Sequence, residues 1–152
     1  NFSQKISHFG FSLLILSILF NSIFSSEISS NLKVGDKILF EKGIITFLSI
    51  ENKEYKNYQS IVGHFKIEDN KKNLVILKPE LRIYNQPYTI TSEADIKTTF
   101  YSDKFLVMNL VKGNEYFNVR YQVKSFMIWI WVSVLLISLG GLISLINKRY
   151  EN

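Results

Sequence analysis

The sequence contains no cysteine, only two prolines among its 152 residues, and only two histidines, His8 and His64. Without cysteine the chain has no disulfide, no thiolate metal site and no cysteine nucleophile. Phosphate-binding glycine loops, metal-ligand clusters and Ser/His/Asp nucleophile spacings are also missing. The chain also has no strong excess of one charge, because residues 27–124 contain 15 Lys and Arg and 12 Asp and Glu. The interspersed charges indicate a solvated surface and give no case for a nucleic-acid partner.

Uncharged residues fill the stretch from Ser125 to Asn147. A helix of this length covers about 34 Å, enough to cross the roughly 30 Å hydrocarbon core of a bilayer. Trp129 and Trp131 lie near one end, where indole rings favour the headgroup region, and Lys148-Arg149 follows the other end. Basic flanks tend to stay on the cytoplasmic side. We therefore predict a membrane-spanning helix with Ser125 outside and Asn147 inside.

A second apolar stretch runs from Ile6 to Ser26, with His8 as its only ionisable side chain. Two hypotheses fit it. It is a spanning helix, which we favour for its length, or it is a secretory signal with Lys5 as the basic start and Ser25-Ser26 before the cleavage point. The chain begins at Asn1 without a Met, which indicates a fragment or a processed product.

If both ends span, the chain is a hairpin with both termini on the inner side and one large outward domain. Gly140-Gly141 in the second helix is a kink, a close helix contact, or simply a pair of glycines that a membrane helix tolerates. The predicted organisation is an N-terminal flank (1–5), a transmembrane helix (6–26), an extracytoplasmic β-rich domain (27–124), a transmembrane helix (125–147) and a cytoplasmic tail (148–152).

The central domain shows strand patterns. Ser60–Glu68 and Tyr116–Val123 alternate apolar and polar residues, and Gly43–Ile50 is a short β-prone run. Phe105–Val111 is nearly continuous and suits a strand buried on both faces, although a short helix would look similar. Ser92–Lys97 has helical leanings, with Ser92 as a cap. Turn signals at 69–73, 78–80 and 112–115 separate these runs and favour a small antiparallel barrel or sandwich.

Few side chains suggest chemistry. His8 lies just inside an apolar segment, where an ionisable group is a functional hypothesis by default, and a neutral imidazole is a good axial ligand for haem iron. The alternative is a half-hydrated histidine at the inner interface. Gly10 and Ser12 would let a macrocycle or a neighbouring helix approach closely. We interpret His64 as a surface histidine, and a cluster around Pro87 as structural ion pairs, the cluster being formed by Glu80, Arg82, Glu93 and Asp95.

Several stretches together resemble the C-terminal portion of the CcmF-type cytochrome c biogenesis proteins. They are His8-Phe9-Gly10 with Leu13–Leu19, then Asn57-Tyr58 and Gly63-His64-Phe65, then Arg82-Ile83-Tyr84, Gln86-Pro87 and Ser92-Glu93-Ala94-Asp95-Ile96, and last Trp129-Ile130-Trp131, Leu135, Gly140-Gly141 and Lys148-Arg149-Tyr150. The resemblance covers essentially the whole chain in order. One departure is Ser125 before Phe126, where the family usually has a proline, and it leaves the local turn geometry open.

The resemblance implies a subunit of the haem lyase that joins haem to apocytochrome c outside an inner membrane, bacterial or mitochondrial. It implies an OB-like barrel in the periplasm or intermembrane space, and a membrane haem b with His8 as one axial ligand of its iron. The second ligand must come from a segment outside this sequence, so the chain is not expected to be catalytic alone. Implied partners are the remaining N-terminal portion of the lyase, a haem chaperone, an apocytochrome-presenting subunit, apocytochrome c and the lipid bilayer.

Two other functions stay open. One is a membrane-anchored β domain with a cleaved signal peptide that acts as a binding or scaffolding module. The other keeps both helices but makes the β domain a brace for neighbouring subunits. A mature N-terminus near Glu27 would favour the first of these.

Overall fold

The structure is a computed structural model that describes residues 2–70, 73–111, 113 and 115–150, with side chains up to residue 147. The chain divides into two compact units. The helical unit contains both ends of the chain and a short internal segment, Thr98–Asp103. The β unit contains Glu27–Lys97 and Lys104–Gln122. Both predicted terminal helices are present, and all the strands lie between them in the chain.

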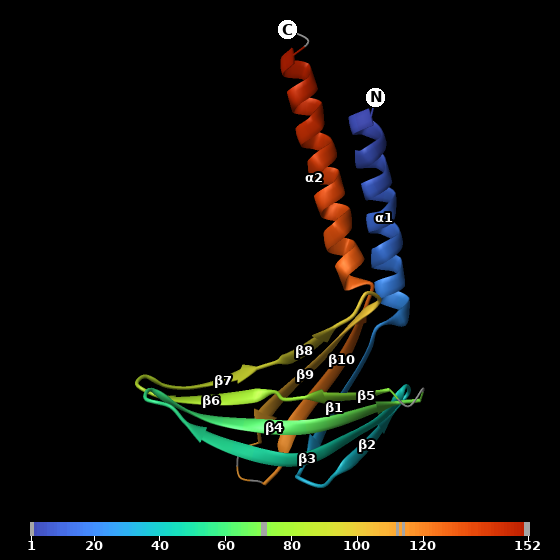
Figure 1. Cartoon of the computed structure of the whole chain (residues 1–152). Coiled ribbons are helices and arrows are strands. Elements are labelled where there is room, and N and C mark those ends of the chain that lie inside the picture. The colour runs from blue at the N-terminus through green and yellow to red at the C-terminus, as the bar shows by residue number, and fades with distance from the viewer. Residues whose placement is uncertain (1, 71–72, 112, 114, 151–152) are drawn as a thin grey trace. The chain divides into compact units, whose positions relative to one another are not determined.

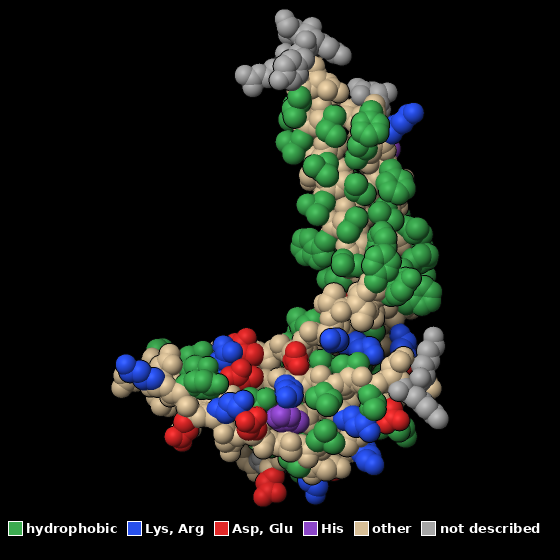
Figure 2. All heavy atoms as spheres, in the orientation of Figure 1, with side chains coloured by type: hydrophobic (Ala, Val, Ile, Leu, Met, Phe, Trp, Pro, Cys, Tyr) green, Lys and Arg blue, Asp and Glu red, His purple; other side chains and the backbone are tan. Residues whose placement is uncertain are grey.

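The helical unit pairs α1 (Phe2–Phe24) with α2 (Met127–Tyr150). The two helices run antiparallel, so the two ends of the chain lie at the same end of the pair (Figure 1). Both helices are long and apolar enough to cross a membrane. Hydrophobic side chains cover their visible face, as Figure 2 shows. The basic residues Lys148 and Arg149, on which the predicted orientation depends, have side chains outside the described residues.

Small residues form the contact between the helices. On α1 the buried residues are Ser3, Gly10 and Ser17, which recur every seven positions and so lie on one face. On α2 the buried small residues are Ser133 and Gly140, and Gly140 lies against Ser3 and Ser7 of α1. Without a strong hydrophobic drive between helices in lipid, close approach of backbones over small residues is what holds such pairs together.

Serine hydroxyls within the helices bond to their own backbone. Ser17 Oγ donates to the carbonyl of Leu13 at 2.7 Å, and Ser133 Oγ donates to that of Trp129 at 2.6 Å. Ser12 and Ser138 make the same bond one turn back, at 3.0 and 2.9 Å. These bonds satisfy polar groups inside the helix, which an apolar environment requires.

The β unit contains two antiparallel sheets (Figure 1). The larger sheet has the order β2-β3-β4-β6-β7 with β5 also paired to β4, and the smaller has the order β1-β10-β9-β8. The strands of the larger sheet are β2 (Lys37–Phe40), β3 (Gly43–Glu54), β4 (Tyr58–Asp69), β5 (Leu74–Leu77), β6 (Glu80–Asn85) and β7 (Tyr88–Glu93). Those of the smaller sheet are β1 (Ser26–Leu32), β8 (Asp95–Thr98), β9 (Ser102–Leu110) and β10 (Phe117–Ser125).

Aromatic rings from both sheets meet in the core. Phe47 stacks on Phe65 with ring centroids 4.2 Å apart, and its ring meets Phe117 of the other sheet edge-on at 5.9 Å. Phe40 and Tyr121 make a second contact between the sheets at 5.3 Å. Apolar burial of this kind is the main stabilising term of a sandwich, roughly 25 cal/mol per Å². An all-β domain flanked by two apolar helices is therefore confirmed, with the strands in two sheets.

The strand patterns hold where one face is apolar. In β4 the residues Gly63, Phe65 and Ile67 are buried, and in β10 the residues Val119 and Tyr121 are buried, as the alternation predicted. β9 is a strand, but burial on both faces is wrong. Leu106 and Met108 are buried, while Phe105 and Val107 are only half-buried and Leu110 is exposed.

The helix predicted at Ser92–Lys97 is wrong, because this stretch is divided between β7 and β8. β7 pairs with β6 over its full length, from Asn85 opposite Tyr88 to Glu80 opposite Glu93. That ladder outweighs the weak local preference of six residues. Ser92 caps no helix, and its hydroxyl instead donates to the Asn109 side chain. The turn predicted at 78–80 is wrong, because β5 and β6 both pair antiparallel with β4 and follow it in one direction, so Lys78-Pro79 only interrupts the pairing. The turns predicted at 69–73 and 112–115 include residues outside the described part.

Candidate functional site

His8 lies on α1, on the side away from α2. Gly10 is buried in the contact between the helices, and successive helical residues are about 100° apart, so His8 lies about 160° around the helix from Gly10. Its side chain is exposed, and its backbone carbonyl accepts the hydroxyl of Ser12 at 3.0 Å. The imidazole is therefore accessible to a group outside this helix pair, and the described part of α2 packs against the opposite side of α1.

Apolar side chains continue the His8 face along α1. Phe11, Ile15 and Leu19 lie three, seven and eleven positions further on, and all are at least half exposed, at 56, 55 and 52%. Among the described residues, the only other histidine belongs to the β unit, and no three His, Cys, Asp or Glu side chains are grouped to hold a metal ion. A single imidazole beside an apolar surface suits ligation of a haem iron better than binding of a bare metal ion.

Gly10 and Gly140 explain why the two helices fit closely. A methyl group added at Gly10 would lie 3.0 Å from both Leu136 and Ile137. A methyl group at Gly140 would lie 2.9 Å from the backbone of Ser3 and Ser7. The glycine pair was predicted to be a kink, a close helix contact or simply tolerated. Gly140 makes a close contact with α1, and α2 is continuous through the pair. At Gly10 the group that approaches closely is the neighbouring helix α2.

His64 is a surface histidine in the middle of β4, as expected. Its Nε2 is 3.3 Å from a carboxylate oxygen of Glu51 on β3, and its side chain is 23% exposed. The hydrogen bond from His64, and then the one from Lys53, lowers the pKa of Glu51. Lys66 and Glu68 pair with each other at 3.4 Å on the same strand. The group is a solvated cross-strand network with no nucleophile.

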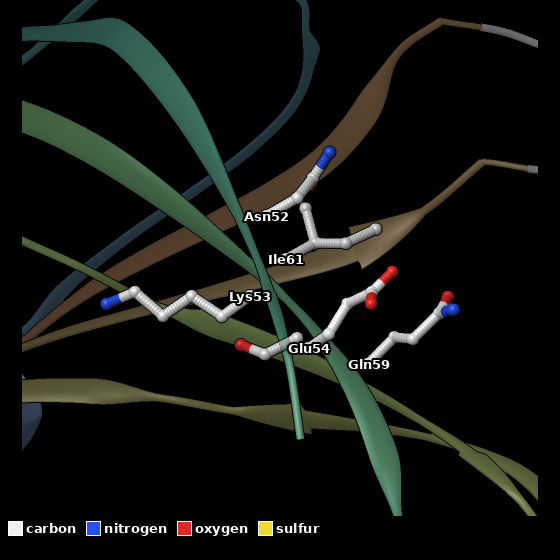
Figure 3. A pocket seen from close by; sticks show the side chains of 6 residues that line it. Asn52, Lys53, Glu54, Gln59 and Ile61 are labelled. Carbon is white, nitrogen blue, oxygen red and sulfur yellow. The ribbon is translucent and has the colours of Figure 1, made fainter. Parts of the chain in front are cut away.

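A shallow hollow of about 180 Å³ lies at the β3–β4 hairpin. In Figure 3 the side chain of Lys53 leaves the ribbon on one side, while Asn52, Glu54 and Gln59 leave it on the other. Glu54 on β3 is paired with Gln59 on β4, and Asn52 and Lys53 are paired with Ile61 and Ser60. The hollow therefore wraps around a hairpin edge and does not form an enclosed cavity that would bury a ligand.

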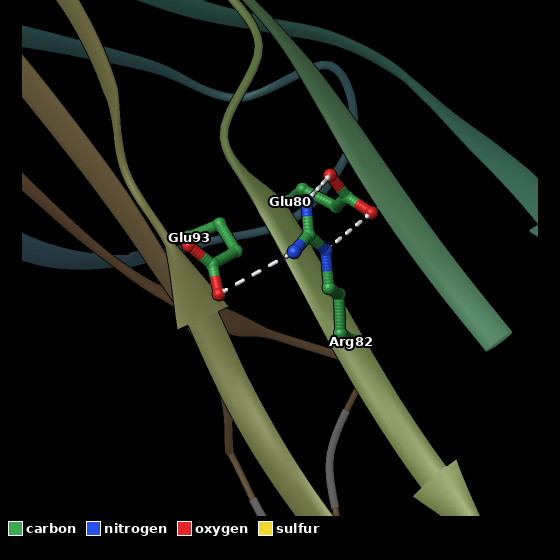
Figure 4. A network of polar contacts seen from close by, with 3 residues as sticks. All are labelled: Glu80, Arg82 and Glu93. Atoms are coloured by element: carbon green, nitrogen blue, oxygen red, sulfur yellow. Dashed lines mark hydrogen bonds and ion pairs between the residues drawn. The ribbon is translucent and has the colours of Figure 1, made fainter. Parts of the chain in front are cut away.

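Arg82 on β6 is the centre of the predicted ion-pair cluster (Figure 4). Its guanidinium donates two bonds to Glu80, at 3.0 and 3.1 Å, and lies 3.8 Å from Glu93 on β7. Hydrogen bonds from Arg82 hold the pKa of Glu80 below its usual range. The guanidinium also lies over the Tyr58 ring, 5.4 Å from its centroid. These contacts tie the β6–β7 hairpin to β4, as expected for structural ion pairs.

Asp95 does not belong to this cluster, contrary to the prediction. Its carboxylate accepts the backbone N–H of Lys78 at 2.6 Å instead. The two halves of the resembling motif, Arg82–Tyr84 and Ser92-Glu93, lie on the paired strands β6 and β7. The number of residues between the two halves is therefore the number needed to form one β-hairpin.

The junction before α2 is the feature that the sequence did not reveal. Phe126 has φ of 59°, a left-handed conformation that costs a non-glycine residue about 1–3 kcal/mol. Its N–H donates to the carbonyl of Tyr101 at 2.8 Å. Beside it, Ser125 N–H donates to Ser25 Oγ at 3.0 Å, and Asn21 Nδ2 donates to the Ser125 carbonyl at 2.6 Å. A proline at position 125 would have no backbone N–H and so could not donate the bond to Ser25.

Comparison with known proteins agrees with this architecture. A family model described as the CcmF C-terminal beta-sandwich matches residues 23–125. A CcmF cytochrome c-type biogenesis protein of Pseudomonas fluorescens is 28% identical over 97% of this chain and 22% of its own length. The biogenesis protein ccl1 of Rhodobacter capsulatus is 33% identical over 79% of this chain and 18% of its own length.

A solved structure named cytochrome c haem lyase CcmF matches with a TM-score of 0.67 and 20% identity, over 92% of this chain and 23% of that one. At that identity the likeness shows the fold. Together these features define an all-β sandwich between two apolar helices, of a membrane-associated class. The chain belongs to the CcmF family and corresponds to its C-terminal β-sandwich. It spans about a fifth of the length of the relatives it matches first.

Proposed function

We propose that this chain is the C-terminal portion of a cytochrome c haem lyase subunit and that His8 is an axial ligand of a haem b in the membrane. The observation that carries the proposal is the exposed imidazole on an apolar helix face, in a chain of the CcmF family. A relative's name gives cytochrome c-type biogenesis as its role, and the matching structure is named a haem lyase.

A haem b bound here would be held by the imidazole of His8, and the exposed Phe11 and Ile15 would offer it apolar surface. The chemistry that such a haem would supply is electron transfer to keep the arriving haem reduced. A second ligand would come from the remaining portion of the lyase, since α2 lies on the other side of α1 from His8. The whole lyase joins haem vinyl groups to the thiols of a CxxCH segment as thioethers, and this chain does not catalyse that reaction alone.

The β unit acts outside the membrane, in the periplasm or intermembrane space, where it frames the site that receives haem and apocytochrome c. A haem chaperone and an apocytochrome-presenting subunit complete the complex. The β6–β7 hairpin suits a framing role, because the Arg82 cluster fixes it to β4 without leaving a catalytic group free. No cysteine of this chain competes with the apocytochrome thiols for haem.

The experiment is His8→Ala in the assembled lyase. We expect loss of the absorption band of a bis-histidine haem, because one axial ligand is removed. His64→Ala is the matched control, since His64 lies on a strand of the β unit with Glu51 as its partner, and it should keep the band. An unchanged band in His8→Ala, at normal protein levels, would remove His8 from the mechanism.

A further inference from the structure

The connection between β8 and β9 belongs to the helical unit and carries two exposed aromatic side chains. Residues Thr98–Asp103 group with α1 and α2, whereas the strands on either side group with the β unit. At its tip Phe100 is 57% exposed and Tyr101 is 65% exposed. Exposed aromatic rings at adjacent positions of a tight turn leave apolar surface that water does not favour.

The tip is rigidly built. Thr99 N–H donates to the Ser102 carbonyl at 2.9 Å, and Ser102 N–H returns a bond to Thr99 Oγ1 at 3.1 Å. The start of α2 uses both tip carbonyls. Phe126 N–H donates to the carbonyl of Tyr101 at 2.8 Å, and Trp129 Nε1 donates to the carbonyl of Phe100 at 3.2 Å. The turn therefore holds its two rings in place, and their exposure does not come from a loose loop.

Rings from three segments surround the first turn of α2. Phe126 packs against Phe20 and Tyr101, with centroids 5.1 and 6.4 Å away. Trp129 meets Phe100 edge-on at 4.9 Å. Two residues beyond, Trp131 is 64% exposed. The exposed rings of the tip are thus continuous with the aromatic end of an apolar helix.

We propose that Phe100 and Tyr101 insert into the lipid headgroup region, so that the β8–β9 turn is a third contact of the chain with the membrane. Tyr and Trp combine an apolar ring with a polar group and favour that region. The apolar run of α2 begins at Met127, so its first turn lies at the bilayer surface when the helix spans. The hydrogen bonds to Phe126 and Trp129 then hold the tip at the same depth. The proposal rests on the proposed crossing of both helices.

Spin-label accessibility in vesicles of phosphatidylcholine and phosphatidylglycerol tests it. Because the chain has no cysteine, a nitroxide on Tyr101→Cys reports one position. We expect more frequent collisions with lipid-soluble oxygen than with a water-soluble nickel chelate. Phe100→Cys, labelled separately, should give the same ratio, which guards against a local fault in either variant. Lys56→Cys, in the polar β3–β4 turn, is the aqueous reference and should show the reverse.

Leu135→Cys separates the failure of this proposal from that of the membrane crossing. Leu135 is 63% exposed on α2, and its label should collide with oxygen at the depth of the hydrocarbon core if the helix spans. A membrane-buried label there, with a nickel-accessible label at Tyr101→Cys and Phe100→Cys, would overturn the interfacial turn alone. Labels on the turn that neither reagent reaches would overturn it as well, since protein would then cover the rings. An aqueous label on Leu135→Cys would overturn both proposals.

Discussion

Arg82 and Glu80 are neighbours on one strand whose side chains are held by two parallel hydrogen bonds. Arg82 is 32% exposed and Glu80 is 21% exposed, so water screens the pair only in part. The Arg82 bonds lower the pKa of Glu80. The stabilising effect is therefore present above the unfolded pKa, about 4.3, and is lost as the pH falls through the lower pKa of the folded state.

Glu80→Gln should remove that component of the pH dependence. The variant is expected to be less stable than the parent at pH 7, and to lose less stability as the pH is lowered from about 6 to 3. Urea denaturation of the full chain in mild detergent, detected by tyrosine near-ultraviolet circular dichroism, gives the unfolding midpoint of the variant and of the parent at each pH. Glu68→Gln is the control, because Glu68 makes a more exposed ion pair with Lys66 at 3.4 Å. Parallel pH profiles for Glu80→Gln and the parent would contradict the prediction.

The residues of the ion-pair cluster show what sequence can and cannot predict. Close spacing around a turn was enough to associate Glu80, Arg82 and Glu93, because β6 and β7 pair across it. Asp95 lies only two positions beyond Glu93, but the chain leaves the ladder there and its carboxylate finds a backbone N–H. Register beyond the end of a hairpin depends on tertiary contacts that a sequence pattern does not contain. The role of His8 likewise rests on the resemblance.

At the scale of elements, the two glycines of α2 have different surroundings. Gly140 faces the backbone of α1 at Ser3 and Ser7, whereas a methyl group at Gly141 would have nothing within 4 Å. The sequence could predict that a glycine pair permits close contact, but not which member makes it. That choice depends on the rotation of α2 about its axis, which the packing against α1 fixes.

Gly140→Ala and Gly141→Ala therefore form a matched pair. Overpacking at Gly140 is expected to cost roughly 1–3 kcal/mol, because backbone atoms of α1 cannot move away as a flexible side chain could. Gly141→Ala should be neutral or stabilise by up to about 1 kcal/mol through better helix propensity. Both tryptophans are on α2, so their fluorescence in an SDS titration reports separation of the helices. Equal midpoints for the two variants would contradict the contact at Gly140.

The junction of β10 and α2 joins the elements in a way that no periodicity revealed. The uncharged run begins at Ser125, yet the helix begins at Met127, because Phe126 turns the chain in the left-handed region. The bonds from Phe126 and Asn21 depend on segments 25 and 104 residues away in the sequence, at Tyr101 and Ser125. Long apolar runs and alternating strands are local signals, whereas such a junction exists only once the chain has folded.

For the whole molecule, the two hypotheses left open by the sequence assign different fates to α1. In the signal-peptide hypothesis α1 is removed, so Gly140 would lose its contact with Ser3 and Ser7. The Ser125 carbonyl would lose its bond from Asn21. Retention of α1 gives an antiparallel pair, in which a single crossing by each helix returns the chain to its starting side. If both helices cross a membrane, we expect the β unit on the side opposite the two ends, because the chain enters and leaves it through the two helices.

The final prediction is that the two ends of the chain share one side of the membrane and the β unit has the other. Lys5→Cys and Asn147→Cys mark the ends, Lys56→Cys marks the β unit, and the chain has no other cysteine. In intact cells or organelles stripped of their outer membrane, an impermeant maleimide should label Lys56→Cys alone. In inverted vesicles it should label the two ends alone. Labelling of the two ends from opposite sides would contradict the hairpin, and a mature N-terminus near Glu27 would instead support the signal-peptide hypothesis, leaving His8 no role in the mature protein.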